Sequence, residues 1–278
     1  MILIFRAPLD LVAMPRRFSY QAIAKHESRD CRSGSGGAMH DKTERMTSVS
    51  IDDGVQPQTR TSSFDASAFI AKNLRLLPVP GLSNIQLYTA HSGSRLSRLG
   101  GTDPDAPAPY WAYGWGGGAV LAHHIAEHPH LVRGRRVLDL GTGSGLVAIV
   151  AAKAGATSVV ATDINENAIA AARLNAAANG VEIDLIHADL LDGQPPAVDI
   201  VLAGDLFYDE ALAKRTLAFL ETCRTAGIDV LIGDPYRMPL PTGKLRCIAE
   251  YSVPDFGLGC DGAEVRAGIF SLATLPDR

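Results

Sequence analysis

The sequence predicts an α/β protein with a seven-stranded, mostly parallel sheet, helices on both faces and an antiparallel last strand. Two observations support this prediction. Short apolar runs alternate with amphipathic segments through the second half of the chain, and one apolar run ends in a glycine-rich turn that a helical pattern follows. Strands separated by helices form βαβ units, whose right-handed crossovers bring the carboxyl ends of parallel strands to one edge. We therefore expect a ligand site at that edge.

Composition narrows the class of protein. The 278 residues are 46% hydrophobic and 20% charged, with a net charge of -4, which is ordinary for a globular protein and gives no sign of nucleic-acid binding. No apolar run reaches the roughly 18 residues that span a bilayer. The 4 cysteines form no C-x-x-C pair and fit no zinc spacing, which predicts reduced thiols. We expect a cytoplasmic monomer that binds neither nucleic acid nor a membrane.

The chain divides by its patterning. Residues 1–60 mix Arg, Ser, Gly and Asp without periodicity and predict a poorly ordered N-terminal extension. Met39 and Met46 lie just before the first patterned segment, so we hypothesise that one of them is the true start. The remainder, 61–278, predicts one domain, with a flanking segment at 61–130 and a core at 131–278.

The elements follow from hydrophobic periodicity. In the flanking segment a helical pattern starts near residue 64, Pro78–Gly81 breaks it, Ile85–Tyr88 alternates like a short strand, and 100–109 is a loop. The predicted core strands are 136–140, 158–162, 183–187, 198–203, 227–232, 246–252 and 264–271. The predicted helices are 117–128, 145–154, 165–178 and 208–222. Because no clear helix separates the last two strands, we expect them to pair antiparallel at the end of the sheet.

The glycine-rich turn predicts the ligand. The strand Val137–Leu140 ends in Gly141-Thr142-Gly143-Ser144-Gly145, and a helix with free N–H groups follows at once. Dinucleotide enzymes with this Rossmann-like arrangement need a third glycine one residue further on, where this chain has Leu146. The observed spacing, with an acid before the loop, favours S-adenosylmethionine. Its methionine part carries an ammonium group, which Asp139 would attract.

Two further carboxylates end the next two strands. Asp163 is placed to accept hydrogen bonds from both ribose hydroxyls, and Asp189 to meet the adenine amino group. Trp115 precedes the loop and is placed to cover the cofactor or to shape the entry. The predicted cofactor-binding residues are Asp139, Gly141, Gly143, Gly145, Asp163, Asp189 and Trp115.

Other motifs carry a resemblance to a known family. They are Pro109-Tyr110-Trp111-Ala112-Tyr113-Gly114-Trp115 with Gly117-Gly118, Gly204-Asp205-Leu206-Phe207-Tyr208-Asp209-Glu210, Val230-Leu231-Ile232-Gly233-Asp234-Pro235, and Glu250-Tyr251-Ser252. With these motifs the chain resembles the class I, or seven-beta-strand, methyltransferases, and more narrowly the lysine methyltransferases of the electron transfer flavoprotein beta subunit. The resemblance spans about 80–270 and implies an S-adenosylmethionine-dependent lysine methyltransferase with that subunit as its protein substrate. Family members often carry proline where this chain has Gly116.

The residues suggest how such a reaction would run. Asp205 follows the fourth core strand, so we expect it to orient the incoming amine and to help its proton leave. Tyr208, three residues on, is placed to line the lysine channel. Other interpretations stay open: Asp205 also suits the cap of the next helix, the tryptophans also suit the core, and Asp234 suits a turn more than a substrate contact.

Alternative functions remain. One is methylation of a ribosomal protein or a small amine, although ribosomal-protein methyltransferases usually carry an Asn-rich motif where this chain has Asp205. Another is a non-catalytic module that binds S-adenosylmethionine. A nicotinamide oxidoreductase is a more distant alternative, against which Leu146 argues. His124 and His128 share a helix face, but the glutamate of the metallohydrolase pattern is missing, so we predict no metal site.

Overall fold

The structure is a computed structural model that describes residues 65–99, 108–255 and 264–273. The predictions of a poorly ordered segment at 1–60 and of a start at Met39 or Met46 lie outside the described residues, as does most of the loop expected at 100–109. The described residues, from 65 to 273 with those gaps, belong to one compact unit.

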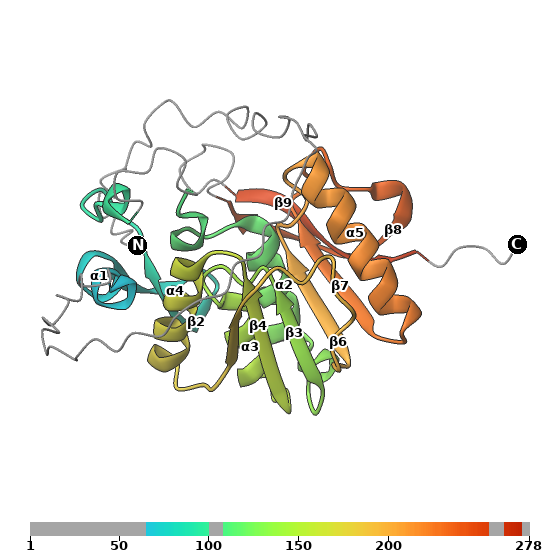
Figure 1. Cartoon of the computed structure of the whole chain (residues 1–278), viewed down its shortest axis with the longest axis horizontal. Helices are drawn as coiled ribbons and strands as arrows, with labels where there is room; N and C mark the ends of the chain where they lie inside the picture. Colours follow the sequence, from blue (N-terminus) through green and yellow to red (C-terminus); the bar gives the residue numbers. More distant parts are fainter. Residues whose placement is uncertain (1–64, 100–107, 256–263, 274–278) are drawn as a thin grey trace, which may run out of the picture. The chain divides into compact units, whose positions relative to one another are not determined.

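A seven-stranded sheet forms the centre of this unit, in the order β5-β4-β3-β6-β7-β9-β8 (Figure 1). Its strands are β3 (Arg136–Leu140), β4 (Ser158–Asp163), β5 (Asp184–His187), β6 (Ile200–Gly204), β7 (Asp229–Asp234), β8 (Leu245–Pro254) and β9 (Glu264–Leu272). The pairs from β5 to β7 are parallel, whereas β9 runs antiparallel to both β7 and β8. The predicted strands and the reversed last strand are confirmed. The strand order reverses between β3 and β6, where ligands bind in sheets of this kind.

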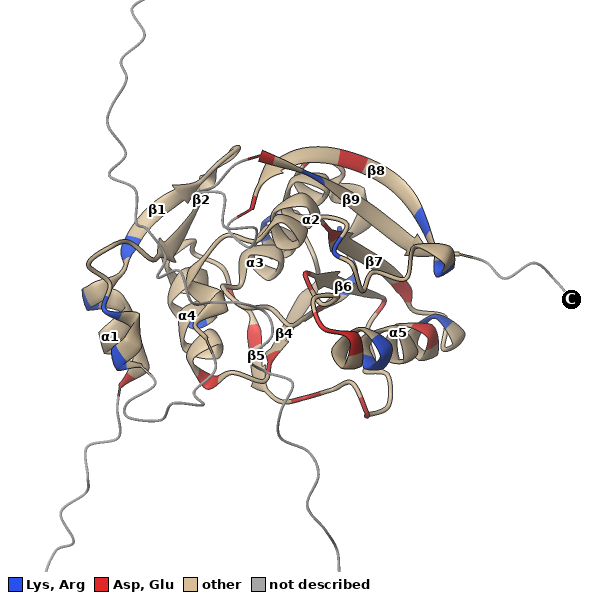
Figure 2. Cartoon of the chain, turned by 90° about the horizontal axis from the view of Figure 1, so that it is seen from above, with Lys and Arg blue, Asp and Glu red and all other residues tan. Residues whose placement is uncertain are grey.

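Helices cover both faces of the sheet, as predicted (Figure 2). On one face lie α2 (Gly116–Glu127), α3 (Leu146–Lys153) and α4 (Glu166–Ala178), and on the other lies α5 (Glu210–Thr225). The sidedness follows from alternation along each strand. In β3, Val137 packs with α2 and α3 while Leu138 packs in the cluster that contains α5.

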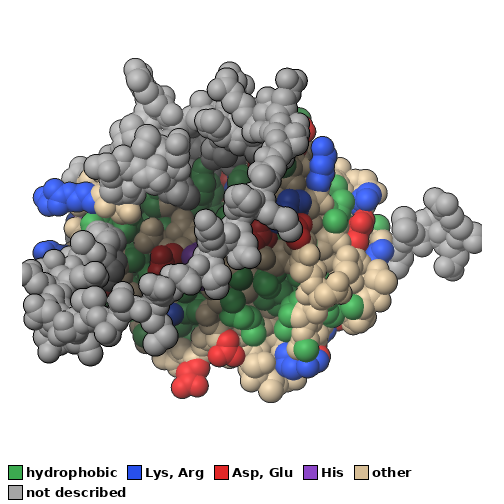
Figure 3. Space-filling model, in the orientation of Figure 1, with side chains coloured by type: hydrophobic (Ala, Val, Ile, Leu, Met, Phe, Trp, Pro, Cys, Tyr) green, Lys and Arg blue, Asp and Glu red, His purple; other side chains and the backbone are tan. Residues whose placement is uncertain are grey.

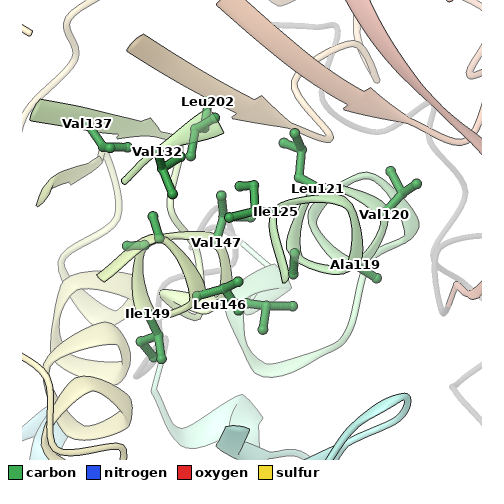
Figure 4. Close-up of a cluster of buried hydrophobic side chains, with 14 of the residues drawn as sticks. Ala119, Val120, Leu121, Ile125, Val132, Val137, Leu146, Val147, Ile149 and Leu202 are labelled. Carbon is green, nitrogen blue, oxygen red and sulfur yellow. The ribbon is translucent and has the colours of Figure 1, made fainter. Parts of the chain in front are cut away.

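The larger apolar cluster fixes α2 and α3 against the sheet. Ile125 of α2 lies beside Val147 of α3, Leu121 points toward the sheet, and the strand residues Val137 and Leu202 belong to the same cluster (Figure 4). Ile125, Val137 and Leu202 have no exposed surface. Burial of such side chains contributes roughly 1.5–3 kcal/mol each relative to exposure, so this contact holds α2 and α3 against the sheet.

The flanking segment forms α1 (Ala66–Asn73) and a hairpin of β1 (Arg75–Val79) and β2 (Leu82–Thr89). The strand expected at 85–88 is part of β2, but β1 was not predicted because Pro78 was interpreted as a break. Proline is tolerated here because β1 pairs on one side only, and the register shifts at Pro78/Val79. The side-chain oxygens of Asn175 on α4 and of Asn179, the C-cap of α4, accept the N–H groups of Tyr88 and Gln86, which attaches the hairpin to the core.

Within the described residues, the helices are too short or too polar for any of them to cross a membrane.

Candidate functional site

The glycine loop lies between β3 and α3 at the strand-order reversal. Gly141, Gly143 and Gly145 have positive φ values of 68°, 53° and 85°, which side chains rarely adopt. A Cβ at Gly141 would lie 2.6 Å from Leu206 Cδ2, whereas at Gly143 the nearest atom would be 3.9 Å away. The space beside Gly143 is therefore open, and a ligand can approach the backbone there.

Asp139 has a structural role that the sequence interpretation missed. Its Oδ2 accepts hydrogen bonds from Thr142 Oγ1 at 2.6 Å and from the Ala148 N–H at 3.0 Å, so it ties the loop to the first turn of α3. The side chain is almost fully buried, and burial raises the pKa of Asp139 to about 6. Its Oδ1 accepts no hydrogen bond from the described residues, so a contact with a cofactor ammonium stays a prediction.

Asp163 connects the end of β4 to the glycine loop. Its Oδ2 accepts the N–H of Gly143 at 2.9 Å, and its Oδ1 accepts the N–H of Asn165 at 2.9 Å. Burial raises the pKa of Asp163, and these two hydrogen bonds oppose the rise. Each carboxylate oxygen keeps a second lone pair for a ligand hydroxyl. The neighbouring Ile164 is 67% exposed, which is unusual for an isoleucine and leaves an apolar surface beside Asp163.

Asp189 lies further along this edge and is engaged with α5. Its Oδ2 lies 2.9 Å from Arg215 Nη2 in an exposed ion pair, and its Oδ1 accepts the N–H of Leu191. The predicted contact with an adenine amino group stays a prediction, because a ligand there would have to use the remaining acceptor positions of this carboxylate.

Asp205 follows β6 in a left-handed conformation, with a φ of 57°. Its Oδ2 accepts the N–H of Gly118 at 2.6 Å, and its Oδ1 lies 2.7 Å from Arg237 Nη2. Burial raises the pKa of Asp205, and the Arg237 guanidinium opposes the rise. The alternative that Asp205 caps the next helix is wrong, since Asp209 Oδ1 accepts the first N–H groups of α5. Asp205 instead caps the first turn of α2.

A cluster of buried charges surrounds Asp205. Asp234 ends β7, and its Oδ1 accepts the N–H of Arg237 at 2.7 Å, which confirms the predicted turn. Asp255 follows β8, and its Oδ1 accepts the N–H of Gly116 at 3.1 Å. Gly116 can make this hydrogen bond because it has an N–H, which a proline would lack. The sequence interpretation missed Arg237 and Asp255, because only the folded sheet brings the ends of β6, β7 and β8 together.

Three aromatic side chains lie beside this cluster. The Trp115 Nε1 donates to the Tyr110 carbonyl oxygen at 2.6 Å, and the two rings meet edge to face with centroids 5.5 Å apart. The Tyr208 ring lies 6.3 Å from that of Tyr110, and the Arg237 guanidinium lies 5.7 Å from the Trp115 ring centroid. The structure thus groups Trp115 with Asp205 and Tyr208. Trp111 is buried and packs in the core with α1 and α4.

The remaining motif residues lie away from this edge or in packing positions. Phe207 has no exposed surface and packs under α5. His124 Nδ1 lies 2.8 Å from the Tyr251 hydroxyl, which donates to Glu127. In the part of the chain that the structure describes, no group of three or more His, Cys, Asp or Glu side chains is arranged to hold a metal ion.

The residues beside β3 and β4 fit the nucleoside and amino-acid ends of S-adenosylmethionine. The space over Gly143 is open, Asp163 offers acceptors for hydroxyl groups, and the exposed Ile164 offers an apolar surface for a purine ring. Acidic side chains also gather in the middle of one face, among hydrophobic ones (Figure 3). With the sheet order and its one reversed strand, these features define the class I S-adenosylmethionine-dependent methyltransferases.

Comparisons with known proteins narrow this class. A sequence profile of the ribosomal protein L11 methyltransferase family (PrmA) matches residues 125–208. The electron transfer flavoprotein beta subunit lysine methyltransferase of Danio rerio is 39% identical over 155 residues, which cover 54% of this chain and 60% of the relative. The protein of the same name from Homo sapiens is 40% identical over 152 residues, which cover 52% of this chain and 58% of the relative.

The Caenorhabditis elegans homologue of these enzymes is 30% identical over 182 residues, which cover 55% of this chain and 75% of the relative. The chain therefore belongs to the family of the electron transfer flavoprotein beta subunit lysine methyltransferases. It spans 60% of the length of the Danio rerio relative. Among solved structures, the ribosomal protein L11 methylase of Lactobacillus delbrueckii subsp. bulgaricus is 26% identical, with 56% of this chain and 78% of that one covered and a TM-score of 0.41.

Proposed function

We propose that this protein is an S-adenosylmethionine-dependent lysine N-methyltransferase whose substrate is the electron transfer flavoprotein beta subunit. The observation that carries the proposal is the division of one sheet edge into two neighbouring parts. Asp163 and the glycine loop offer the contacts of a nucleoside, while Asp205 offers a carboxylate beside the aromatic rings of Trp115 and Tyr208. Family membership supports the choice of protein substrate.

The chemistry needs an uncharged amine in line with a reactive methyl group. When bound, the cofactor supplies a methyl group on a positively charged sulfur, and the lone pair of the amine forms the new nitrogen–carbon bond as the carbon–sulfur bond breaks. A lysine side chain is protonated at neutral pH, with a reference pKa of about 10.4, so it must first release a proton.

The residues of this chain supply positioning and charge. Asp205 accepts a hydrogen bond from the substrate ammonium, orients it and favours its approach from solvent. The departing proton passes through this carboxylate to solvent. The aromatic faces of Tyr208 and Tyr110 attract both the alkylammonium and its methylated product. Asp139, Gly141, Gly143, Gly145, Asp163 and Asp189 remain the proposed cofactor contacts, and Trp115 is assigned to the substrate side.

A ribosomal protein is a second candidate substrate, and the PrmA match over residues 125–208 favours it. That match covers β3 to β6 and ends at Tyr208, so it includes the glycine loop but leaves out the Asp234–Arg237 turn. A cytoplasmic site of action is proposed as well, supported by Cys223 and Cys247, which form no disulfide with any described residue.

The test is methylation of purified candidate substrates with isotope-labelled S-adenosylmethionine. The electron transfer flavoprotein, ribosomal protein L11 and a free lysine peptide are incubated in parallel, and the labelled residue is located by mass spectrometry. We expect label on a lysine of the flavoprotein beta subunit. Label on L11 alone would overturn the substrate assignment, and label on a residue other than lysine would overturn the reaction.

Asp205→Asn separates an enzyme from a binding module. We expect this variant to keep its affinity for S-adenosylhomocysteine and to lose methylation by about 100-fold or more, because the neutral amide cannot take a proton. Asp199→Asn, at the opposite edge of the sheet, serves as the matched control and should methylate normally. Equal turnover in Asp205→Asn and the unsubstituted chain would remove Asp205 from the chemistry.

A further inference from the structure

Arg237 is buried to an extent that arginine seldom is. Its side chain is 8% exposed, and its Nη2 lies 2.7 Å from Asp205 Oδ1 and 3.6 Å from Asp255 Oδ1. Buried ion pairs are weak sources of stability, because the cost of removing both charges from water offsets their attraction. The position of Arg237 therefore points to a use other than holding the fold together.

The loop that carries Arg237 is fixed before any substrate arrives. Its backbone N–H donates to Asp234 Oδ1 at 2.7 Å. The preceding Tyr236 donates its hydroxyl to Glu250 on β8 and packs its ring edge to face against Phe270 on β9, with centroids 5.3 Å apart. Arg237 therefore lies in a turn that is fixed on one side by contacts with β8 and β9 and on the other side by the hydrogen bond to Asp234.

Backbone strain is concentrated at this contact. Among the described residues other than glycine, only Arg95, Asp205 and Tyr236 have positive φ values. Asp205, at 57°, is one member of the ion pair, and Tyr236, at 61°, directly precedes the other. Such conformations cost about 1–3 kcal/mol each and persist where the surrounding structure enforces them, most often at functional sites. Two of these three strained positions therefore lie at the contact between Asp205 and Arg237.

We propose that Arg237 is a positioning residue for methyl transfer, which holds the Asp205 carboxylate in the direction of the incoming lysine. This inference rests on the proposed function. The Asp205 carboxylate has fixed donors on both sides, the N–H groups at the start of α2, from Gly117 and Gly118, and Arg237 Nη2 on Oδ1, so the direction of the carboxylate plane is set before the ammonium arrives. The Trp115 ring beside the guanidinium keeps Arg237 in place.

Arg237 also keeps Asp205 ionised. Burial raises the pKa of Asp205 and the Arg237 charge is the first influence that lowers it, followed by the N–H groups of α2. In the part of the chain that the structure describes, the other charged groups that face this pair are carboxylates, Asp234 at the end of β7 and Asp255 after β8. Without Arg237 the pKa of Asp205 would rise further, so its ionised form would appear only at higher pH. The acid limb of the methylation profile, which is the pH range in which kcat/KM falls as the pH is lowered, would then move to higher pH.

Arg237→Met and Arg237→Lys test this proposal, with Arg136→Met as the matched control. Arg136 also lies 2.7 Å from an aspartate, Asp199, but at the opposite edge of the sheet. Three quantities are measured for each protein: affinity for S-adenosylhomocysteine by calorimetry, the pH dependence of kcat/KM for methylation, and the titration of the Asp205 carboxyl carbon by NMR, assigned with Asp205→Asn.

In Arg237→Met we expect the acid limb and the Asp205 titration to move up by about one pH unit or more, with unchanged cofactor-product affinity. Arg237→Lys should keep the limb near its original place but lower kcat by about tenfold, because a lysine cannot reproduce the planar fork of the guanidinium. Arg136→Met should match the unsubstituted chain in all three measurements.

An Asp205 titration that is the same with and without the Arg237 guanidinium would overturn the proposal. The proposal would also be overturned if Arg237→Met lowered the activity but the acid limb of the kcat/KM profile stayed at the same pH. A purely structural role of Arg237 predicts that result. If Arg237→Met does not fold, full kcat in Arg237→Lys overturns the proposal. The NMR titration needs no methylation. A protein that methylates no lysine would therefore count against the proposed function, while the titration would still test whether Arg237 lowers the pKa of Asp205.

Discussion

Asp234 is a buried carboxyl group whose ionised form lowers the stability of the fold. Its side chain has no exposed surface, and its Oδ2 makes no hydrogen bond with the described residues. Burial raises the pKa of Asp234 to about 7, aided by the Asp205 charge and opposed by the Arg237 N–H and charge. A carboxyl group that binds its proton more tightly in the folded than in the unfolded state loses stabilising effect as the pH rises. For Asp234 this loss falls between about pH 4 and about pH 7.

Asp234→Asn is therefore predicted to stabilise the protein at high pH. The amide keeps an oxygen for the Arg237 N–H and removes the buried charge, so the free energy of unfolding at pH 8 should rise by about 1–3 kcal/mol. At pH 5, where Asp234 is already protonated, the difference should be small or of opposite sign. Urea unfolding of both proteins at pH 5 and pH 8 measures these free energies. If Asp234→Asn changed the free energy of unfolding by the same amount at both pH values, the raised pKa of Asp234 would be contradicted.

Single residues of the site were predictable where they follow a strand directly. Asp139, Asp163 and Asp205 lie within one residue of the carboxyl end of a strand that the apolar pattern marks, so their place at one edge follows from right-handed crossovers. Arg237 and Asp255 were not predictable in this way, because their approach to Asp205 depends on a strained turn at Tyr236 and on β8 returning beside β9. No local pattern in the sequence encodes that register.

The start of α2 rests directly on the ends of β6 and β7. A Cβ at Gly117 would lie 2.3 Å from the Gly233 carbonyl oxygen and 2.6 Å from the Asp205 backbone nitrogen. These atoms are backbone and cannot move aside. The glycines in this motif therefore allow a helix N-terminus to reach the strand ends, which is how the N–H of Gly118 meets Asp205.

Gly117→Ala should displace α2 and lower the free energy of unfolding by about 2 kcal/mol or more. Gly118→Ala is the matched control, because a Cβ there would meet only Asp205 Oδ2 at 3.8 Å and alanine favours a helix. We expect Gly118→Ala to be as stable as the unsubstituted chain or slightly more so. Thermal and urea unfolding of the two variants measure the difference, and similar stabilities would contradict the close contact described here.

Elements with strong periodicity were predicted from the sequence, while those that depend on pairing were not. The helices α2 to α5 and the seven core strands begin and end within three residues of the predicted ranges, because alternation and helical spacing differ clearly in them. The strand β1 was missed, because Pro78 signals a break and only the hairpin shows that it lies on an unpaired edge. The order of β8 and β9 follows from pairing alone.

At the scale of the whole described unit, one sheet edge holds two sets of charges. The loops after β3 and β4 present acceptors and open backbone, and the loops after β6, β7 and β8 present a buried ion pair with two further carboxylates. The start of α2 approaches the second set and is itself held by the core that it shares with α3. Packing of α2 and α3 on one face of the sheet therefore helps to position the charged side chains at the sheet edge.

The central claim is that the β3–β4 part of this edge binds the nucleoside of S-adenosylmethionine. Calorimetric titration with S-adenosylhomocysteine tests it most directly, with Asp163→Asn as the variant and Asp199→Asn at the opposite edge as the control. We expect binding at one site, at least about tenfold weaker in Asp163→Asn because a hydroxyl acceptor is lost, and unchanged in the control. Absence of binding in the folded chain, or binding of a nicotinamide dinucleotide in its place, would contradict the account.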